Sequence, residues 1–253
     1  MAKKVSIFCT GSPKIFHELV CSVEDSIKEL YPFNTYYWNP NKKLHQADIN
    51  IVIHGKNIIN YLTHGSFNIL IATEQPQNAI IEKHGYHVVL DIVDGNKDYF
   101  PLGYSKFFDI EKHADTEDID YVFFGQSTEK RRKDIAKRYG INYYSEVYGE
   151  KRDALISRAK FNVNILNYPE KMYSPLRGML SFCKGKVLLQ EKAKGFYGHH
   201  KPYIIEFTEH NFRDVVEKWK DDKKRKEFGM FIRESLMKQS FKENFLNRLK
   251  KHI

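Results

Sequence analysis

The sequence predicts an α/β protein of two domains, each built around a parallel sheet. Three observations lead to this prediction. The chain has 253 residues, more than most single domains contain. Short apolar runs rich in β-branched and aromatic residues alternate with amphipathic stretches. The alternation pauses once and then resumes, which favours two α/β domains in tandem.

The expected strands of the first half are apolar on both faces, as is typical of strands buried inside a parallel sheet. Helical patterns separate several of them. The expected strands lie at residues 4–12, 34–38, 47–55, 67–76 and 86–95, and the expected helices at 13–30 and 56–65.

The pause covers about residues 96–120, and the stretch 95–120 holds a proline, two glycines and an acidic cluster, which indicate a linker. Strand patterns resume at 121–125, 141–147, 160–166, 186–191 and 203–207, with helical patterns at 128–140, 150–159, 174–185 and 211–252. The alternative is a single flavodoxin-like or Rossmann sheet with an appendage, in which the second series continues the first sheet. The linker-like segment argues against that alternative.

The charge of the two halves differs. Through Ile110 there are 10 lysines, no arginine and 11 acidic residues, which gives −1. From Glu111 onward 31 basic residues face 21 acidic ones, which gives +10 and accounts for the formal net charge of +9. A basic surplus suits an anionic ligand, either a small phosphate compound or a nucleic acid. A solubilising surface is the alternative interpretation.

The sequence also bears on location. The apolar stretch after the N-terminal lysines is five residues long, too short for a signal peptide. No run approaches the ~20 apolar residues that span a bilayer. The three cysteines are widely spaced and odd in number, as expected for reduced thiols. We expect a cytoplasmic protein without a membrane span, in the host cytoplasm if the chain is viral.

Candidate ligand-binding residues follow the expected strands, because ligands of parallel sheets bind beyond the carboxyl ends of the strands. This criterion selects residues of both halves. They are Gly11, Ser12, His54, Gly55, Glu74 and Gln75 in the first half, and Gly125, Gln126, Ser127, Tyr148, Gly149, residues 164–167 and Glu191 in the second.

The stretch "YVFFGQSTEKRR", residues 121–132, indicates a strand, a glycine and the start of a helix. Ser127 or Thr128 suits the N-cap, whose free N–H groups favour an anion. Arg131 or Arg132 would add charge-assisted hydrogen bonds. Only one of them is expected to point inward, because adjacent helical residues diverge by about 100°. The alternative is an ordinary capped helix with a solvated basic face.

The stretch "SPLR" is a second candidate anion site. Ser174 suits an N-cap, Pro175 the first helical position, and Leu176 and Arg177 the first turn. An arginine in the first turn opposes the helix dipole, so its presence favours a partner anion. A surface arginine at a helix start is the alternative.

These motifs resemble a known family. The run from "YVFFGQSTEKRRKDI" through "YGEKRDALISRAKFNVNI" to "SPLRGMLSFCKGKVLLQE" is similar to the nucleotide-binding domain of GT-B glycosyltransferases, in particular those of phages and of spore-maturation-type proteins. The resemblance covers 121–208 well and the first half loosely, through "NILIATEQP". It implies two Rossmann-like domains facing a cleft. Residues 1–110 would hold the acceptor and 111–235 the donor, with a last helix at 236–253 packing back on the first domain.

The resemblance also implies roles for single residues. A nucleotide-sugar, which we expect to be a UDP-sugar, would be the co-substrate. Its diphosphate would lie between Ser127, Arg131 or Arg132, and the turn with Arg177. The remaining donor-binding residues implied are Gly11, Ser12, Gly125 and Gln126, with Ser174, Pro175 and Leu176 beside Arg177, Tyr148 and Gly149 near the base, and Glu191 at the ribose hydroxyls.

Glu74 is the expected catalytic base if the reaction inverts configuration, because burial in a cleft would raise the pKa of a strand-end acid. His54 is a rival for the role, and a helix-capping function is the alternative for Glu74. The glutamate pair of many retaining relatives is not intact, since Leu180 occupies the place of the second.

A metal site is not expected. The "DID" at 118–120 precedes its strand instead of following it, and His199 and His200 have no ligand partners at suitable spacing. The two histidines belong to "EKAKGFYGHHKP", which we interpret as a flexible basic loop that could form a lid.

The sequence and the family resemblance lead to three hypotheses for the function of the protein. The leading hypothesis is a glycosyltransferase acting on a hydroxymethylated base in double-stranded phage DNA. The second is a glycosyltransferase for a surface saccharide or a lipid-linked precursor. The third is a nucleotide- or nucleic-acid-binding protein without enzymatic activity. Whether a hexose or a pentose is moved stays open.

Overall fold

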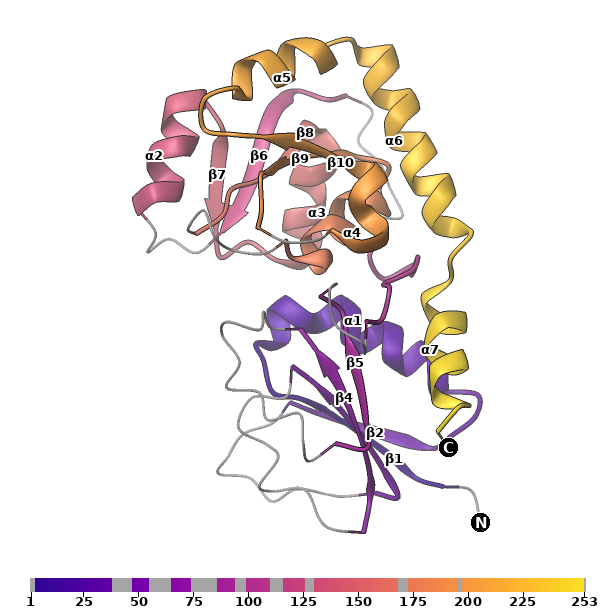
Figure 1. Cartoon of the computed structure of the whole chain (residues 1–253). Coiled ribbons are helices and arrows are strands. Elements are labelled where there is room, and N and C mark those ends of the chain that lie inside the picture. The colour runs from indigo at the N-terminus through magenta and orange to yellow at the C-terminus, as the bar shows by residue number, and fades with distance from the viewer. Residues whose placement is uncertain are drawn as a thin grey trace. The chain divides into compact units, whose positions relative to one another are not determined.

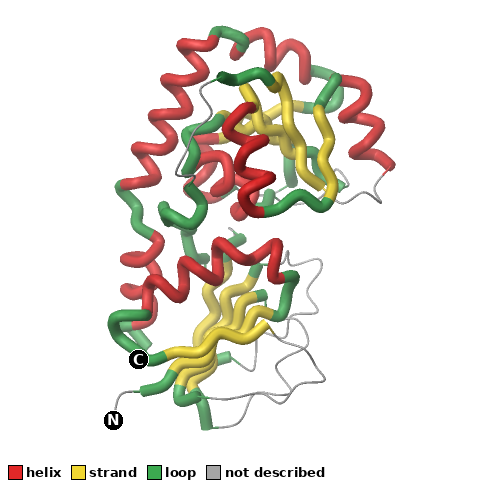
Figure 2. Tube along the Cα trace, turned by 180° about the vertical axis from the view of Figure 1, so that it is seen from behind, coloured by secondary structure: helices red, strands yellow, loops and turns green. Residues whose placement is uncertain are grey.

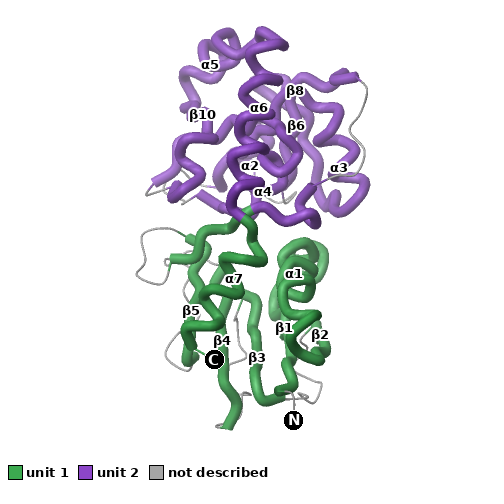
Figure 3. The backbone as a smooth tube through the Cα atoms, turned by 90° about the vertical axis from the view of Figure 1, so that its right-hand side faces the viewer, with its two compact units in different colours: residues 1–103, 240–253 green, residues 104–239 purple. Residues whose placement is uncertain are grey.

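The chain forms two compact units in the computed structural model (Figure 3). Unit 1 comprises residues 1–103 and 240–253, and unit 2 comprises residues 104–239. The structure describes residues 3–37, 47–54, 65–73, 86–93, 99–109, 116–125, 130–167, 173–194 and 197–252. The expected domain boundaries, after residues 110 and 235, lie close to those of the two units.

Unit 1 contains a parallel sheet whose described strands follow the order β2-β1-β3-β4-β5 (Figure 1). Its central strands are fully buried because nearly every residue is apolar. The elements are β1 (Val5–Cys9), β2 (Phe33–Tyr37), β3 (Ile49–Ile53), β4 (Phe67–Ala72) and β5 (Val88–Asp91), with helices α1 (Pro13–Ile27) and α7 (Phe241–Leu249).

Helix α1 forms where the sequence predicts it. Pro13 occupies the first helical position, and the apolar residues Phe16, Leu19, Val20, Val23 and Ile27 recur at helical spacing and are buried. Helix α7, from the other end of the chain, packs against α1 within unit 1.

Unit 2 contains a second parallel sheet, with described strands in the order β10-β9-β8-β6-β7 and helices around it (Figure 2). The strands are β6 (Ile119–Gly125), β7 (Asn142–Ser145), β8 (Ala159–Asn164), β9 (Val187–Glu191) and β10 (Ile204–Phe207). The helices are α2 (Lys130–Tyr139), α3 (Gly149–Arg158), α4 (Pro175–Phe182), α5 (Phe212–Trp219), α6 (Asp222–Met237) and the 3₁₀-helix η3 (Gly198–Tyr203).

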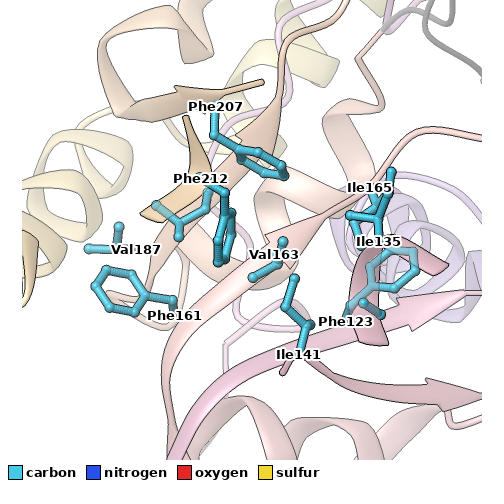
Figure 4. Packing of buried hydrophobic residues seen from close by; sticks show 11 residues of the cluster. Phe123, Ile135, Ile141, Phe161, Val163, Ile165, Val187, Phe207 and Phe212 are labelled. Atoms are coloured by element: carbon cyan, nitrogen blue, oxygen red, sulfur yellow. The ribbon is translucent and has the colours of Figure 1, made fainter. Parts of the chain in front are cut away.

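The larger core cluster of unit 2 lies on one face of this sheet (Figure 4), and Ile119, Val122 and Ala159 belong to a second cluster. In the larger cluster, alternate residues of the strands meet with residues of α2 and α5. The labelled members are Phe123, Ile135, Ile141, Phe161, Val163, Ile165, Val187, Phe207 and Phe212. The rings of Phe207 and Phe212 contact edge to face, with centroids 5.0 Å apart.

Both sheets share one topology. In sequence order each runs second, first, third, fourth, fifth, so the connections leave in opposite directions between the first and third strands. Such a topological switch point is where ligands of open parallel sheets bind. The switch points lie between β1 and β3 in unit 1, and between β6 and β8 in unit 2. The predicted α/β class is confirmed, and the two separate sheets exclude the single-sheet alternative.

The expected linker at 96–120 contains the boundary between the two units, after residue 103, but its described part is not an exposed connection. Phe100, Leu102 and Phe108 are buried core residues. Phe100 packs edge to face on Phe241 of α7, with ring centroids 5.7 Å apart. Turn-forming residues set the local backbone but do not prevent the apolar residues between them from being buried.

The interpretation of 192–202 as a flexible loop was also wrong for its described end. Residues 198–203 form η3, and His200 is only 1% exposed. Its Nδ1 lies 3.0 Å from the Tyr173 hydroxyl, and its ring meets that of Phe182 edge to face. Contacts with Tyr173 and Phe182 hold His200 in place in this part of the basic segment. Residues 195–196 lie outside the described part.

Helix α6 is attached to the sheet by a buried charge cluster. Glu117 accepts hydrogen bonds from Lys186 and from Arg225, the latter at 2.6 Å. Arg225 also donates to Asp222 at 2.7 Å and is 2% exposed. Glu117, Lys186 and Arg225 therefore compensate one another largely away from water, while Asp222 is exposed.

Candidate functional site

The candidate site lies at the carboxyl edge of the unit 2 sheet, around the switch point between β6 and β8. Residues from the ends of these two strands, from β9, and from the first turns of α2 and α4 converge there. They are Phe123, Phe124, Gly125, Arg131, Arg132, Leu166, Arg177 and Glu191.

Two arginines meet on one aromatic ring at the end of β6. The guanidinium carbon of Arg132 lies 5.4 Å from the centroid of the Phe123 ring, and that of Arg177 lies 5.8 Å from it. Arg177 also donates from Nη1 to the carbonyl of Phe124 at 2.5 Å. The ring and the carbonyl thus orient two cations from different helices toward the same strand end.

Gly125 keeps this strand end open. A Cβ at this position would lie 2.9 Å from the Phe123 ring and 3.4 Å from Nη1 of Arg132. A larger residue would therefore push against the two side chains that define the site. A residue without a Cβ therefore fits this strand end best.

The side chain of Arg131 points toward Glu191 instead of Phe123. Its guanidinium forms a bidentate pair with Glu191 and donates to the carbonyl of Leu166 at 2.7 Å. Glu209 lies further away, with an N–O distance of 3.8 Å. The pairing with Glu191 raises the pKa of Arg131, so the guanidinium stays charged. The two adjacent arginines thus diverge, as helix geometry requires.

Helix α4 starts at the predicted position. Ser174 is the N-cap with an extended backbone, and Pro175 is the first helical residue. The Ser174 side chain makes no capping hydrogen bond. Leu176 and Arg177 form the first turn, and Arg177 reaches the Phe124 carbonyl from there. Gly178 lets Tyr173 pack against the helix, since a Cβ would overlap the Tyr173 hydroxyl.

The other predicted donor-site residues of unit 2 lie after the edge strand β7 or outside the described residues. Tyr148 and Gly149 follow the edge strand β7, where Tyr148 is the N-cap of α3. Gly149 has a φ of 57°, which favours glycine. Gln126 and Ser127, like Thr128, lie outside the described residues, as does the predicted base Glu74.

Unit 1 places three predicted residues at its own switch point. Gly11 and Ser12 follow β1, and His54 follows β3. His54 has a φ of 80°, and its Nδ1 lies 2.8 Å from the Thr73 hydroxyl at the end of β4. Its ring packs on Phe16, with centroids 5.1 Å apart. A histidine held in a left-handed conformation is a strained arrangement of the kind found at functional sites.

Among the described residues no cluster of histidine, cysteine and acidic side chains could hold a metal ion. Asp118 pairs with Arg158, and Asp120 pairs with Lys160 at 2.8 Å. Within the same part of the chain, no helix combines the length and the apolar character that crossing a membrane requires.

No protein-family model and no curated protein matches the sequence. Solved structures do match. The chain superimposes on HepE of Anabaena, solved in complex with UDP, with a TM-score of 0.62 and 8% identity over 98% of this chain and 100% of that one. AviGT4, a glycosyltransferase involved in avilamycin A biosynthesis, gives a TM-score of 0.54 and 12% identity over 98% and 97%. The chain has the GT-B fold.

Within this GT-B fold, the sequence identified most of the converging residues but not Phe123 or Phe124. Phe123 is one of two adjacent phenylalanines in an apolar strand, and nothing in that pattern marks it as the support for two arginines. Phe124 takes part through its backbone carbonyl, which the residue type does not reveal.

Proposed function

We propose that the protein is a glycosyltransferase that transfers a sugar from a nucleotide-sugar donor to a hydroxyl acceptor. The observation that carries this proposal is the convergence of Arg132 and Arg177 on Phe123, beside Gly125, at the switch point of a GT-B unit. Two guanidinium groups at one strand end match the charge and geometry of a diphosphate.

The donor we propose is a UDP-sugar, bound by unit 2. The presence of UDP in the HepE structure supports a uridine nucleotide. In the reaction the bond between the sugar and the diphosphate breaks, and negative charge develops on the leaving diphosphate. Arg132 and Arg177 would stabilise that charge, and cations preorganised in this way are an effective form of electrostatic catalysis. We propose that the arginines fulfil this role without a resident metal ion.

Unit 1 would bind the acceptor and supply the group that removes its proton. Glu74 and His54 are the two candidates for this group. The strained backbone of His54 and its contact with Thr73 favour a functional role at that position. Replacing the true base, as Glu74→Gln or His54→Gln, should reduce kcat and leave donor binding unchanged.

For the acceptor, the finer hypothesis is a hydroxymethylated base in double-stranded phage DNA, extruded from the duplex. The charge of +10 after residue 110 supports it, while the near-neutral first half favours the alternative of a surface saccharide or lipid-linked precursor. Binding that weakens steeply with added salt supports DNA. Retention only on oligosaccharide or on membrane fractions supports the alternative.

The test of donor binding is a thermal-shift panel of UDP, GDP, ADP, CDP and their common sugar conjugates. A ligand at about 100 times its Kd stabilises the folded state by roughly 2.7 kcal/mol, which shifts Tm by several degrees. We expect a shift from the uridine compounds, and we expect Arg177→Ala to abolish it.

The matched control is Arg158→Gln, which removes an arginine of the same unit whose partner is the exposed Asp118. It should retain the full shift. If no nucleotide shifts Tm, the donor assignment fails, and a nucleic-acid-binding protein without enzymatic activity becomes the better interpretation. Slow hydrolysis of a donor without an acceptor would exclude that interpretation.

A further inference from the structure

An ion pair joins two of the predicted donor ligands to each other. Glu191 is the last residue of β9, and its side chain is only 7% exposed. Its carboxylate oxygens accept hydrogen bonds from both terminal nitrogens of Arg131, of which Nη1 to Oε2 spans 3.1 Å. A bidentate pair of this kind fixes the orientation of the arginine as well as its distance.

The same two side chains hold the backbone of Leu166, just beyond β8. Glu191 Oε2 accepts the Leu166 N–H at 2.8 Å, and the Leu166 carbonyl accepts from Arg131 Nη1 at 2.7 Å. The pairing of β8 with β9 ends at Asn164 and Gln190. The ion pair therefore continues the connection between these strands past their last paired residues and fixes the start of the following loop.

The pair also fixes the rotation of α2. Arg131 lies in the first turn of that helix, and Arg132 follows it about 100° further round the axis. With Arg131 held by Glu191, the side chain of Arg132 is directed toward Phe123 and Gly125. A rotation of the first turn would move Arg132 away from that strand end.

We propose that Arg131 and Glu191 are positioning residues for donor binding, and not donor ligands: their ion pair directs Arg132 and fixes the Leu166 backbone. The inference rests on the proposed function. Both terminal nitrogens of Arg131 are engaged by Glu191 or Leu166, and separating the buried carboxylate from its partner to bind a phosphate would be strongly unfavourable. Both oxygens of Glu191 already accept hydrogen bonds and its side chain is only 7% exposed, which leaves little of it for a ribose.

The test uses inorganic pyrophosphate, a probe that carries the diphosphate charge but no ribose. Its Kd and that of UDP are measured by calorimetry for the wild type, Arg131→Gln, Glu191→Gln and the double variant. Each single substitution should weaken pyrophosphate binding by about tenfold or more, the loss typical of residues that orient a ligand-binding group. The double variant should lose no more than the weaker-binding single variant, because all three break the same pair.

Three results of these measurements would overturn the inference. If Glu191→Gln weakens UDP but leaves pyrophosphate unchanged, Glu191 contacts the nucleoside. If the losses of the single variants multiply in the double variant, the two residues act as independent ligands. A purely structural pair would lower Tm but leave the pyrophosphate affinity of the folded variants unchanged, which also contradicts a positioning role.

The design includes two safeguards. Arg158→Gln, which breaks an exposed bidentate pair in the same unit, should change neither Kd nor the circular dichroism spectrum. If a single variant does not fold, Arg131→Lys carries the test, because it keeps the charge beside Glu191 but not the bidentate geometry. Wild-type pyrophosphate affinity in folded Arg131→Lys would overturn the inference, and a clear loss would support it.

Failure of the proposed function looks different from failure of this inference. If the wild type binds neither a nucleotide nor pyrophosphate, the proposed function fails and the positioning role fails with it. If the wild type binds both and the variants behave as independent ligands, only the positioning role is lost.

Discussion

At Gly125 the candidate site leaves no room for a larger side chain. A methyl group there would meet the Phe123 ring at 2.9 Å, and Phe123 supports both arginines. We expect Gly125→Ala to lower the free energy of unfolding by about 1–3 kcal/mol through overpacking. Because the ring and Arg132 must move, the Tm shift produced by UDP should also shrink. Urea denaturation and thermal shift measure the two effects.

Gly65→Ala is the matched control for this substitution. A Cβ at Gly65 would have no neighbour within 4 Å, so neither stability nor the UDP shift should change beyond error. A Gly125→Ala variant that binds UDP like the wild type would show that the ligand does not approach this strand end.

At the level of single residues, the sequence predicts only part of the candidate site. The pattern "EKRR" predicted that one of two adjacent arginines would point inward, because helix geometry separates them. It could not predict which one, because the partner of Arg131 is Glu191, 60 residues further along the chain. Glu191 itself was selected from its place at a strand end, and the family resemblance implied a ribose ligand; neither reveals an ion pair.

At the scale of elements, the attachment of α6 depends on Glu117. This carboxylate compensates both Lys186 and the buried Arg225. We expect Glu117→Gln to lower the free energy of unfolding at pH 7 by about 3–5 kcal/mol, because it leaves a buried charge uncompensated. Urea denaturation measures the change. Asp120→Asn, which removes an exposed partner of Lys160, is the control and should have no measurable effect.

The same residue predicts a dependence on pH. Burial alone would raise the pKa of Glu117, but hydrogen bonds from Lys186 and Arg225 outweigh it and hold the pKa below its usual value. Glu117 therefore stabilises the fold above the pKa of the unfolded carboxyl and loses this effect as the pH falls through the lower folded-state pKa. The stability difference between the wild type and Glu117→Gln should shrink in acid. A difference that stays constant down to strongly acidic pH would contradict this account.

Elements differ in how well the sequence predicts them. Central strands such as β1, β3 and β4 coincide with apolar runs, because a strand buried on both faces leaves a continuous hydrophobic signal. The segments around Phe100 and His200 were predicted wrongly. Their glycine, proline and charged residues resemble those of exposed loops, whereas their burial depends on aromatic partners that are distant in sequence, such as Phe241 and Tyr173.

On the scale of the whole molecule, unit 1 is assembled from both ends of the chain. Phe245 of α7 is fully buried and packs on Phe100 and Phe241. We expect Phe245→Ala to lower the free energy of unfolding of unit 1 by about 3–5 kcal/mol. Hydrogen exchange should accelerate in β1, β3 and β4, while the strands of unit 2 keep their protection.

Phe231→Ala serves as the control because Phe231 lies on α6 in unit 2 and is 53% exposed. It should leave the exchange of unit 1 unchanged. Equal acceleration in both units after Phe245→Ala would mean that the two units unfold together and would contradict the local effect.

The number of sheets and the fold could be predicted at this scale, because the alternation of strands and helices restarts after a pause. The strand order within each sheet could not, since it depends on which strands pair and not on their sequence spacing. The site follows from that order: Gly125 and Leu166 become neighbours only because β6 and β8 are adjacent.

The two-ended assembly of unit 1 has a consequence for synthesis of the chain. A ribosome produces the strands of unit 1 first but adds residues 104–239 before it reaches the segment that contains α7. At ordinary rates of translation this interval is on the order of ten seconds. During that time the surface of α1 and Phe100 lacks its cover. Unit 2 can therefore finish folding first, and the part of the protein that is made earliest is completed last.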